Sequence, residues 1–148
     1  MSPTHHVIAS AITSAAFYCV NPSLPATAGC FLSGIFIDLD HVVDLWVHKK
    51  KLFFTVKELF RFCEVEKEGK LRLWLHSYEL LFLFWAAIYV FHLGSLWIGI
   101  ALGLTVHMIL DQIFNPVKPL VYFLAYRIRH NFSRECTFNE ATYRKLME

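Results

Sequence analysis

The stretch Gly34-Ile35-Phe36-Ile37-Asp38-Leu39-Asp40-His41 decides the fold, because an uncharged apolar run ends there in carboxylates and an imidazole. Residues 7 to 37 contain no Asp, Glu, Lys or Arg. An apolar segment of that length is normally followed by Lys or Arg at a membrane surface. Acidic side chains and a histidine in this place therefore indicate a chemical role, and metal binding is the first candidate.

The composition places the chain among membrane proteins. Its 148 residues suit one domain, with 56% hydrophobic and only 18% charged residues, against about 25% charged in soluble domains. The formal net charge of +2 is too small to predict nucleic-acid binding, which needs a concentrated basic surface. The 4 cysteines form no Cys-x-x-Cys pair and are predicted to be free thiols. The N-terminus lacks a basic region and a cleavage site, so no removable signal peptide is expected.

Apolar segments are predicted to cross the membrane as two helical hairpins. Each segment is close to the ~20 residues that span a bilayer, and the turns within the hairpins carry Asn21-Pro22 and Gly94-Ser95. Gly29, Gly99 and Gly103 predict close helix packing. The alternative is an all-helical soluble core, which the long charge-free runs argue against. The predicted transmembrane segments are about 4–20, 26–46, 71–92 and 96–114.

Two further segments are polar and basic. Residues 52–63 place apolar side chains at helical spacing among charges, which predicts an amphipathic helix on the membrane surface or on the rest of the protein. Residues 117–148 are predicted to form a C-terminal surface segment. The predicted fold class is therefore all-α: a single membrane-embedded domain, 1–148, with about four transmembrane helices in two hairpins and amphipathic surface helices.

This threading places all 14 Lys and Arg residues on one side of the membrane. Because basic loops stay in the cytoplasm, a multi-pass protein with cytoplasmic N- and C-termini is predicted. The same threading brings a set of His and Asp residues near helix ends to the cytoplasmic level. These candidate metal ligands are His6, Asp38, Asp40, His41, His76, His107 and Asp111.

Each candidate ligand has a simpler explanation when it is taken alone. His6 can cap a helix, and His107 with Asp111 at i, i+4 can form an ordinary helix-end contact. An Asp within an apolar helix nevertheless costs about 2.5–3.5 kcal/mol on insertion scales, and such residues mark function by default. A metal site explains all of the candidates together.

The ligand types constrain the metal. Imidazole and carboxylate without thiolate suit zinc first, with manganese, iron or cobalt as alternatives, and the candidates outnumber the ligands of a closed zinc site, so two ions fit. A dinuclear site lowers the pKa of a bound water and holds the attacking and leaving oxygens of a phosphoester. Asp40 and Asp111 are the candidates for proton transfer. Basic flanking residues would hold anionic lipid headgroups near the site.

The order of these motifs resembles a family of membrane-bound, metal-dependent hydrolases of bacterial inner membranes and archaea, itself distantly similar to zinc-dependent phospholipase C. The resemblance covers about residues 4 to 118 and implies a bacterial or archaeal cytoplasmic membrane. It also implies metal at every candidate ligand, with Asp40 as a ligand or a base. The matching residues are His6-x-x-x-Ser10, Gly34-x-x-x-Asp38-x-Asp40-His41, His76-Ser77 and Gly103-x-x-x-His107-x-x-x-Asp111, with Pro116 shortly after.

The chain departs from the family pattern at two places. Ile37 replaces the usual Pro, and Leu73-Trp74-Leu75 stands where the family has Arg, Gly and Thr that could orient phosphate, with Arg72 as a substitute. Two functions therefore remain: a hydrolase of phosphoesters, lipid-linked ones included, that uses metal-activated water, and a non-catalytic membrane interaction protein with a structural metal or polar cluster. A haem-binding bundle is disfavoured because carboxylates lie at the level of the histidines. The oligomeric state is left open.

Overall fold

The computed structural model describes residues 3–50, 55, 70 and 72–147. Within these ranges the chain is mostly helical and has no strand, apart from an isolated bridge between Val117 and Phe138. The all-α prediction is confirmed. The amphipathic helix predicted for 52–63 lies outside the described residues.

The chain divides into two compact units, and each is assembled from two separated stretches of sequence. Unit 1 comprises Met1–Ile37 and Tyr78–Asn115, and unit 2 comprises Asp38–Ser77 and Pro116–Glu148. Unit 1 contains no Lys or Arg, so all 14 of these residues belong to unit 2. The single domain predicted for 1–148 stays a prediction.

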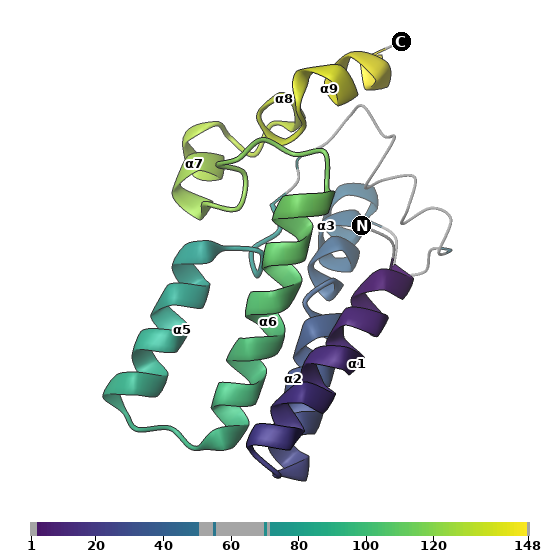
Figure 1. The fold of residues 1–148 in the computed structure, drawn as a ribbon. Coiled ribbons are helices and arrows are strands. Elements are labelled where there is room, and N and C mark those ends of the chain that lie inside the picture. Colours follow the sequence, from purple (N-terminus) through teal and green to yellow (C-terminus); the bar gives the residue numbers. More distant parts are fainter. Residues whose placement is uncertain (1–2, 51–54, 56–69, 71, 148) are drawn as a thin grey trace. The chain divides into compact units, whose positions relative to one another are not determined.

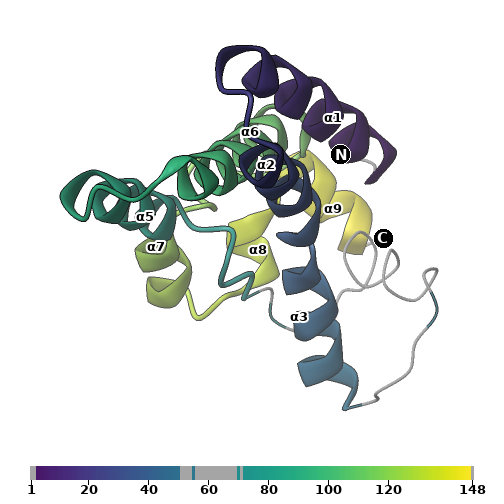
Figure 2. The same cartoon turned by 90° about the horizontal axis from the view of Figure 1, so that it is seen from below.

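Unit 1 is a bundle of helices that run side by side (Figure 1). A short turn joins α1 to α2, and another joins α5 to α6. Helix α6 packs against α1, α2 and α5 and lies between α2 and α5 (Figure 2). The bounds are Pro3–Val20 for α1, Leu24–Phe36 for α2, Tyr78–Val90 for α5 and Ser95–Phe114 for α6.

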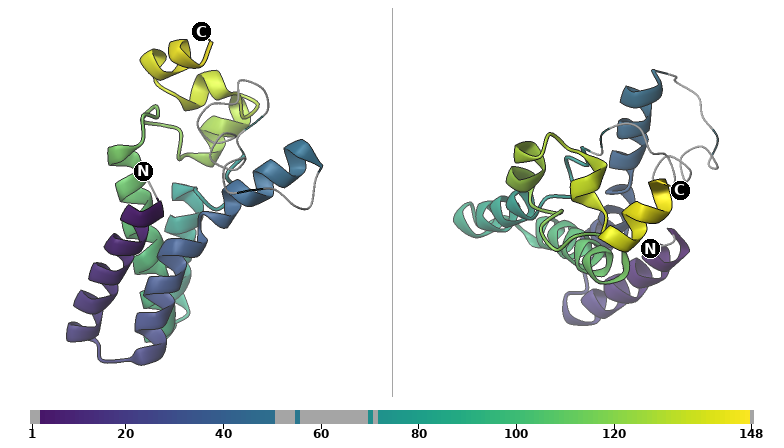
Figure 3. Two further views of the ribbon diagram at one scale, coloured as in Figure 1. Left: turned by 90° about the vertical axis from the view of Figure 1, so that its right-hand side faces the viewer. Right: turned by 90° about the horizontal axis from the view of Figure 1, so that it is seen from above.

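Unit 2 contains one longer helix, α3, and a run of short helices near the C-terminus (Figure 3). The bounds are Leu39–Lys49 for α3, Leu124–Arg129 for α7, Arg134–Thr137 for α8 and Glu140–Met147 for α9. The sequence predicted only a surface segment for 117–148. The structure differs because Val121, Tyr122 and Arg127 of this segment are buried.

Two of the predicted transmembrane segments have other helix bounds. The segment predicted as 26–46 is broken: α2 ends at Phe36 and α3 starts at Leu39, with Asp38 in the N-cap position but without a side-chain capping hydrogen bond. In the segment predicted as 71–92, residues 72–77 are not helical and α5 begins at Tyr78. Asp44 and Asp40 of α3 accept hydrogen bonds from the main-chain N–H groups of Arg72 and Leu75, which precede α5. Side-chain acceptors of this kind compete with helix formation.

Length and composition single out α6 among the described helices. It alone is long and apolar enough to cross a membrane, and α5 is apolar but shorter. The core helix of a soluble protein can have the same properties, so one such helix is weak evidence. The prediction of four membrane crossings stays a prediction.

Unit 1 places large apolar side chains outside and polar ones inside. Phe82, Tyr89 and Phe91 are 73%, 80% and 71% exposed. In contrast, His107 and Asp111 are 2% and 3% exposed. The helices of this unit therefore pack mainly through small and polar residues and leave their large apolar side chains on the surface.

Close packing of α2 against α6 depends on glycine, as Gly99-x-x-x-Gly103 predicted. A Cβ atom at Gly99 would overlap the carbonyl oxygen of Ala26, and one at Gly103 would overlap the carbonyl oxygen of Cys30. Backbone contact of this kind is the usual consequence of small residues one helical turn apart. Any larger side chain at either position forces the two helices apart.

Small residues of α2 bring it close to both of its neighbours. The Ser33 hydroxyl donates a hydrogen bond of 2.9 Å to the Ile100 carbonyl oxygen on α6. A Cβ atom at Gly34 would overlap the Ser10 hydroxyl on α1. Helix α2 thereby holds α1 and α6 at fixed positions, and these two helices carry the polar residues of unit 1.

We expect Gly99→Ala and Gly103→Ala each to lower the free energy of unfolding by about 1–3 kcal/mol, the usual cost of overpacking. Gly94→Ser is the control, because a Cβ atom there meets nothing within 4 Å. Denaturant unfolding of the purified protein measures the effect. If Gly99→Ala and Gly103→Ala were as stable as Gly94→Ser, that result would contradict the close packing of α2 and α6.

Candidate functional site

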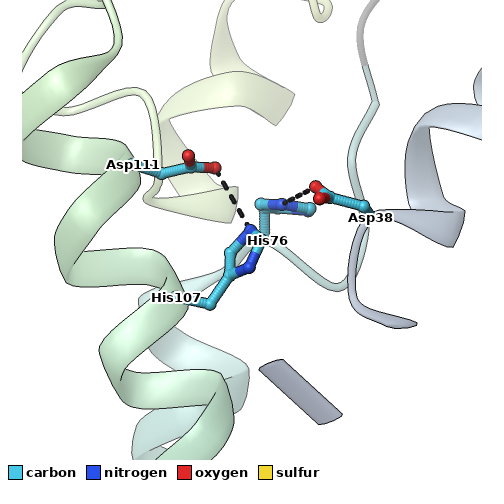
Figure 4. Close-up of side chains that lie close together, drawn as sticks. All are labelled: Asp38, His76, His107 and Asp111. Atoms are coloured by element: carbon cyan, nitrogen blue, oxygen red, sulfur yellow. Dashed lines mark ion pairs between the residues drawn. The ribbon is translucent and has the colours of Figure 1, made fainter. Parts of the chain in front are cut away.

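The first polar cluster is buried in unit 1 and consists of His6, His107 and Asp111. His107 and Asp111 lie one turn apart on α6, so their side chains share a face. His6 Nε2 lies 3.0 Å from Asp111 Oδ1, and His107 Nε2 lies 3.4 Å from Asp111 Oδ2 (Figure 4 draws the second pair). The two imidazole rings stack with centroids 3.9 Å apart. One carboxylate thus faces both imidazoles, each through a different oxygen.

The hydrogen bond of His107 to the main chain fixes its tautomer. Its Nδ1 atom lies 2.7 Å from the Gly34 carbonyl oxygen, which can only accept, so Nδ1 carries the hydrogen. In the neutral ring Nε2 then presents a lone pair toward the carboxylate of Asp111. Two lone pairs face each other favourably only with a cation between them, either a proton or a metal ion. The cluster is therefore arranged to hold a cation.

The second polar cluster belongs to unit 2 and consists of Asp38, Asp40, His41 and His76. Asp38 Oδ1 lies 3.7 Å from His76 Nε2 (Figure 4) and 3.8 Å from His41 Nε2. These separations are longer than a hydrogen bond. Two ligand atoms about 2.1 Å from a tetrahedral zinc lie roughly 3.4 Å apart. The spacing around Asp38 therefore suits atoms that share an ion.

Asp40 positions His76 through its Oδ2 atom. That oxygen lies 3.3 Å from His76 Nδ1 and accepts hydrogen bonds from the main-chain N–H groups of Leu75 and His76, at 2.5 and 3.2 Å. A carboxylate that holds one imidazole nitrogen directs the other nitrogen, and metal-binding histidines commonly have this partner. The contacts of Asp40 fit this orienting role. Its predicted roles as ligand and base stay predictions.

Residues 72–77, which precede α5, are held by two charged side chains that the sequence analysis missed. Asp44 Oδ2 accepts hydrogen bonds from the N–H groups of Arg72 and Leu73, at 2.5 and 3.0 Å. The Arg127 guanidinium donates to the carbonyl oxygens of Arg72 and Leu73, both at 2.6 Å, and of His76 at 2.8 Å. Asp44 and Arg127 are 1% and 3% exposed.

The sequence contains a signal for only one of these two residues. Asp44 follows Asp40 by one helical turn, so both carboxylates lie on the same face of α3. That pairing could have been used to predict a shared target. Arg127 is one of several basic residues in the C-terminal stretch, and nothing local distinguishes it from Arg129.

All of the predicted ligands belong to one of the two clusters. The sequence placed them at one membrane level, and the structure groups His6, His107 and Asp111 in unit 1 and the others in unit 2. Imidazole and carboxylate groups that can bind a metal ion are therefore present, and nothing identifies the metal. The free thiols predicted for Cys19, Cys30 and Cys136 are confirmed, and Cys63 lies outside the described residues.

Comparison with known proteins gives no relative: no family model, curated protein or solved structure matches this chain.

We expect the pH dependence of stability to change in Asp44→Asn. Burial raises the pKa of Asp44 above its ordinary value of 3.8, although the N–H groups of Leu73 and Arg72 oppose the shift. The folded state then keeps a proton that the unfolded state has lost, so the contribution of Asp44 is most favourable below pH 3.8 and falls as pH rises through the raised pKa. The amide does not titrate, so this slope disappears in the variant.

Denaturant unfolding at a series of acid pH values measures the slope. The control is Glu140→Gln, because the side chain of Glu140 is 84% exposed. An unchanged slope in Asp44→Asn would contradict the effect of burial on this carboxyl group.

Proposed function

We propose that this chain is a membrane-bound, metal-dependent hydrolase that cleaves phosphoesters at the cytoplasmic face of a bacterial or archaeal membrane. The observation that carries the proposal is the burial of Asp111 beside the imidazoles of His6 and His107, which lie 3.0 and 3.4 Å from its two oxygens. Imidazole and carboxylate side chains gathered in one buried site are the ligand types that zinc and related divalent ions prefer. A metal ion bound with His6 and His107 would use these groups.

The surface of unit 1 supports a membrane location. Its helices present large apolar side chains such as Phe82, Tyr89 and Ile113, and the unit contains no Lys or Arg. In lipid, the outward apolar surface costs nothing, and helices associate through small residues as α2 and α6 do. We therefore propose that α1, α2, α5 and α6 form the membrane-embedded part, with the basic residues of unit 2 in the cytoplasm.

Helix lengths are compatible with polar residues near one membrane face. At 1.5 Å per residue the 20 residues of α6 span about 30 Å, whereas the 13 residues of α2 and α5 span only about 20 Å. Helix α2 ends just before Asp38, and α5 starts just after His76. The short helices thus stop beside candidate ligands, where water would have access from the cytoplasm.

The proposed reaction is hydrolysis by activated water. A bound divalent ion, zinc first for imidazole and carboxylate ligands, lowers the pKa of its water and polarises a phosphoester. In this proposal the metal ligands in unit 1 are His6, His107 and Asp111. The metal ligands in unit 2 are Asp38, His41 and His76. Asp40 orients His76, and Asp111 or Asp40 accepts a proton. The number of ions is one or two.

The basic residues favour an anionic substrate close to the membrane. All 14 Lys and Arg residues belong to unit 2, as do Asp38 and His76. Basic side chains near a cytoplasmic membrane surface attract anionic lipid headgroups. A phosphoester in a lipid headgroup or a lipid-linked phosphate is therefore the proposed substrate class.

One observation favours a non-catalytic function. Leu73 and Leu75 carry apolar side chains where a phosphate-binding segment would carry donors, and their N–H groups are hydrogen-bonded to Asp44 and Asp40. Such a segment offers a substrate little besides Arg72. A membrane interaction protein with a structural metal is the second candidate function.

We expect the purified protein to contain zinc or another divalent metal and to hydrolyse a phosphomonoester, phosphodiester or lipid phosphate. His107→Ala and Asp38→Ala should each lower the metal content, and removal of metal by a chelator should abolish hydrolysis. Elemental analysis and phosphate release measure these effects. Thr142→Ala is a control far from the ligands in sequence.

Two results would separate the candidate functions. A metal-free protein whose stability is unchanged in both variants would contradict the metal centre. A metal-loaded protein that cleaves no member of the substrate panel would contradict the hydrolase and favour the non-catalytic function.

We expect opposite labelling of two cysteines in intact cells. Asn21→Cys, in the turn between α1 and α2, should react with a membrane-impermeant maleimide from outside in a variant without other cysteines. Cys136, kept as the single cysteine, should react only after the membrane is permeabilised. Labelling of both from the same side would contradict the proposed topology.

A further inference from the structure

Main-chain groups of residues 72–77 are bound on two sides by side chains of other segments. On one side, Asp44 accepts the N–H groups of Arg72 and Leu73, and Asp40 accepts that of His76. On the other side, Arg127 donates to the carbonyl oxygens of the same three residues. The segment is not helical, so charged side chains provide the pairing that buried main-chain groups need.

The backbone conformation of Leu73 is a second indication that other segments fix residues 72–77. Its φ angle is 44°, in the left-handed region that costs a residue other than glycine about 1–2 kcal/mol. A strained residue of this kind persists only where its surroundings fix it, and such residues gather at functional sites. The Leu73 N–H group is bound by Asp44 and its carbonyl oxygen by Arg127, so the two side chains fix the strained residue directly.

We infer that Arg127 and Asp44 are positioning residues that fix the main chain of residues 72–77 and thereby hold His76 as a metal ligand. The inference rests on the proposed metal centre. Arg127 binds the carbonyl oxygen of His76 itself, and Asp40 holds the N–H group and the Nδ1 atom of the same residue. Backbone and imidazole of His76 are thus fixed together, and the Nε2 atom faces Asp38.

The contacts of Arg127 distinguish this role from substrate binding. Both terminal nitrogens of its guanidinium donate to main-chain carbonyl oxygens, and the residue is 3% exposed. A guanidinium used in this way stabilises a protein segment and does not present its donors to a phosphate. Tyr122, from the same C-terminal stretch, also stacks on the ring of His76 with centroids 6.2 Å apart. The C-terminal stretch therefore supports a ligand that lies far from it in sequence.

Metal affinity tests the inference. We expect Arg127→Ala to weaken binding of zinc about 10- to 100-fold, the usual effect of removing a group that orients a ligand. Arg127→Lys keeps the charge but loses the paired donors, so it should have intermediate affinity. Added methylguanidine should restore affinity in Arg127→Ala, which a general loss of stability would not allow. Arg129→Ala, on the exposed side of the same helix, is the matched control and should bind zinc normally.

The design includes Asp44→Asn and His76→Ala, and competition with a chromophoric chelator gives the affinity of each variant. Circular dichroism verifies the helical fold before titration. Asp44→Asn keeps one acceptor oxygen and should weaken zinc binding less than Arg127→Ala. If Arg127→Ala does not fold, Arg127→Lys decides: weaker zinc binding with an intact fold supports the inference, and unchanged affinity overturns it.

The outcome with His76→Ala separates the two proposals. Unchanged zinc affinity in His76→Ala would overturn His76 as a ligand and with it this part of the proposed function. Loss of affinity in His76→Ala together with normal affinity in a folded Arg127→Ala would leave the metal centre intact and overturn only the positioning role.

Discussion

The contacts of the buried Asp111 carboxylate with two imidazoles join α1 to α6 in unit 1. The unit contains no Lys or Arg, and two imidazoles of the same unit face this charge. His6 and His107 lie within 3.0 and 3.4 Å of its two oxygens. These positions require α1 and α6 to stay close together, and the small residues of α2 make that possible. Packing and charge compensation are therefore coupled in this unit.

Unit 2 uses its charged residues in another way. Asp44 and Arg127 are buried, and hydrogen bonds join each of them to main-chain groups of residues 72–77. Main-chain hydrogen bonds offset part of the cost of burying these two side chains. This arrangement gives an irregular segment the rigidity that a helix would otherwise supply. It also explains why residues 72–77, which were predicted to be helical, form no helix.

Charged residues are distributed very differently between the two units. Unit 1 contains Glu79 and Asp111 as its only charged residues, whereas unit 2 contains all of the Lys and Arg. The chain passes from one unit to the other next to candidate ligands: Asp38 follows Ile37, and Ser77 separates His76 from α5. Asp38 directly precedes α3, and His76 belongs to the hydrogen-bonded segment 72–77.

Sequence patterns alone determined the helical class, the α1–α2 and α5–α6 pairs, the close packing at Gly99 and Gly103, and the identity of the candidate ligands. These features depend on apolar run length, small-residue spacing and residue type, which are local properties. Only the tertiary structure decided that the helix breaks before Asp38 and that Asp44 and Arg127 hold residues 72–77. The partners in those hydrogen bonds lie far apart in sequence, and no local pattern reports which carbonyl oxygen a distant arginine binds.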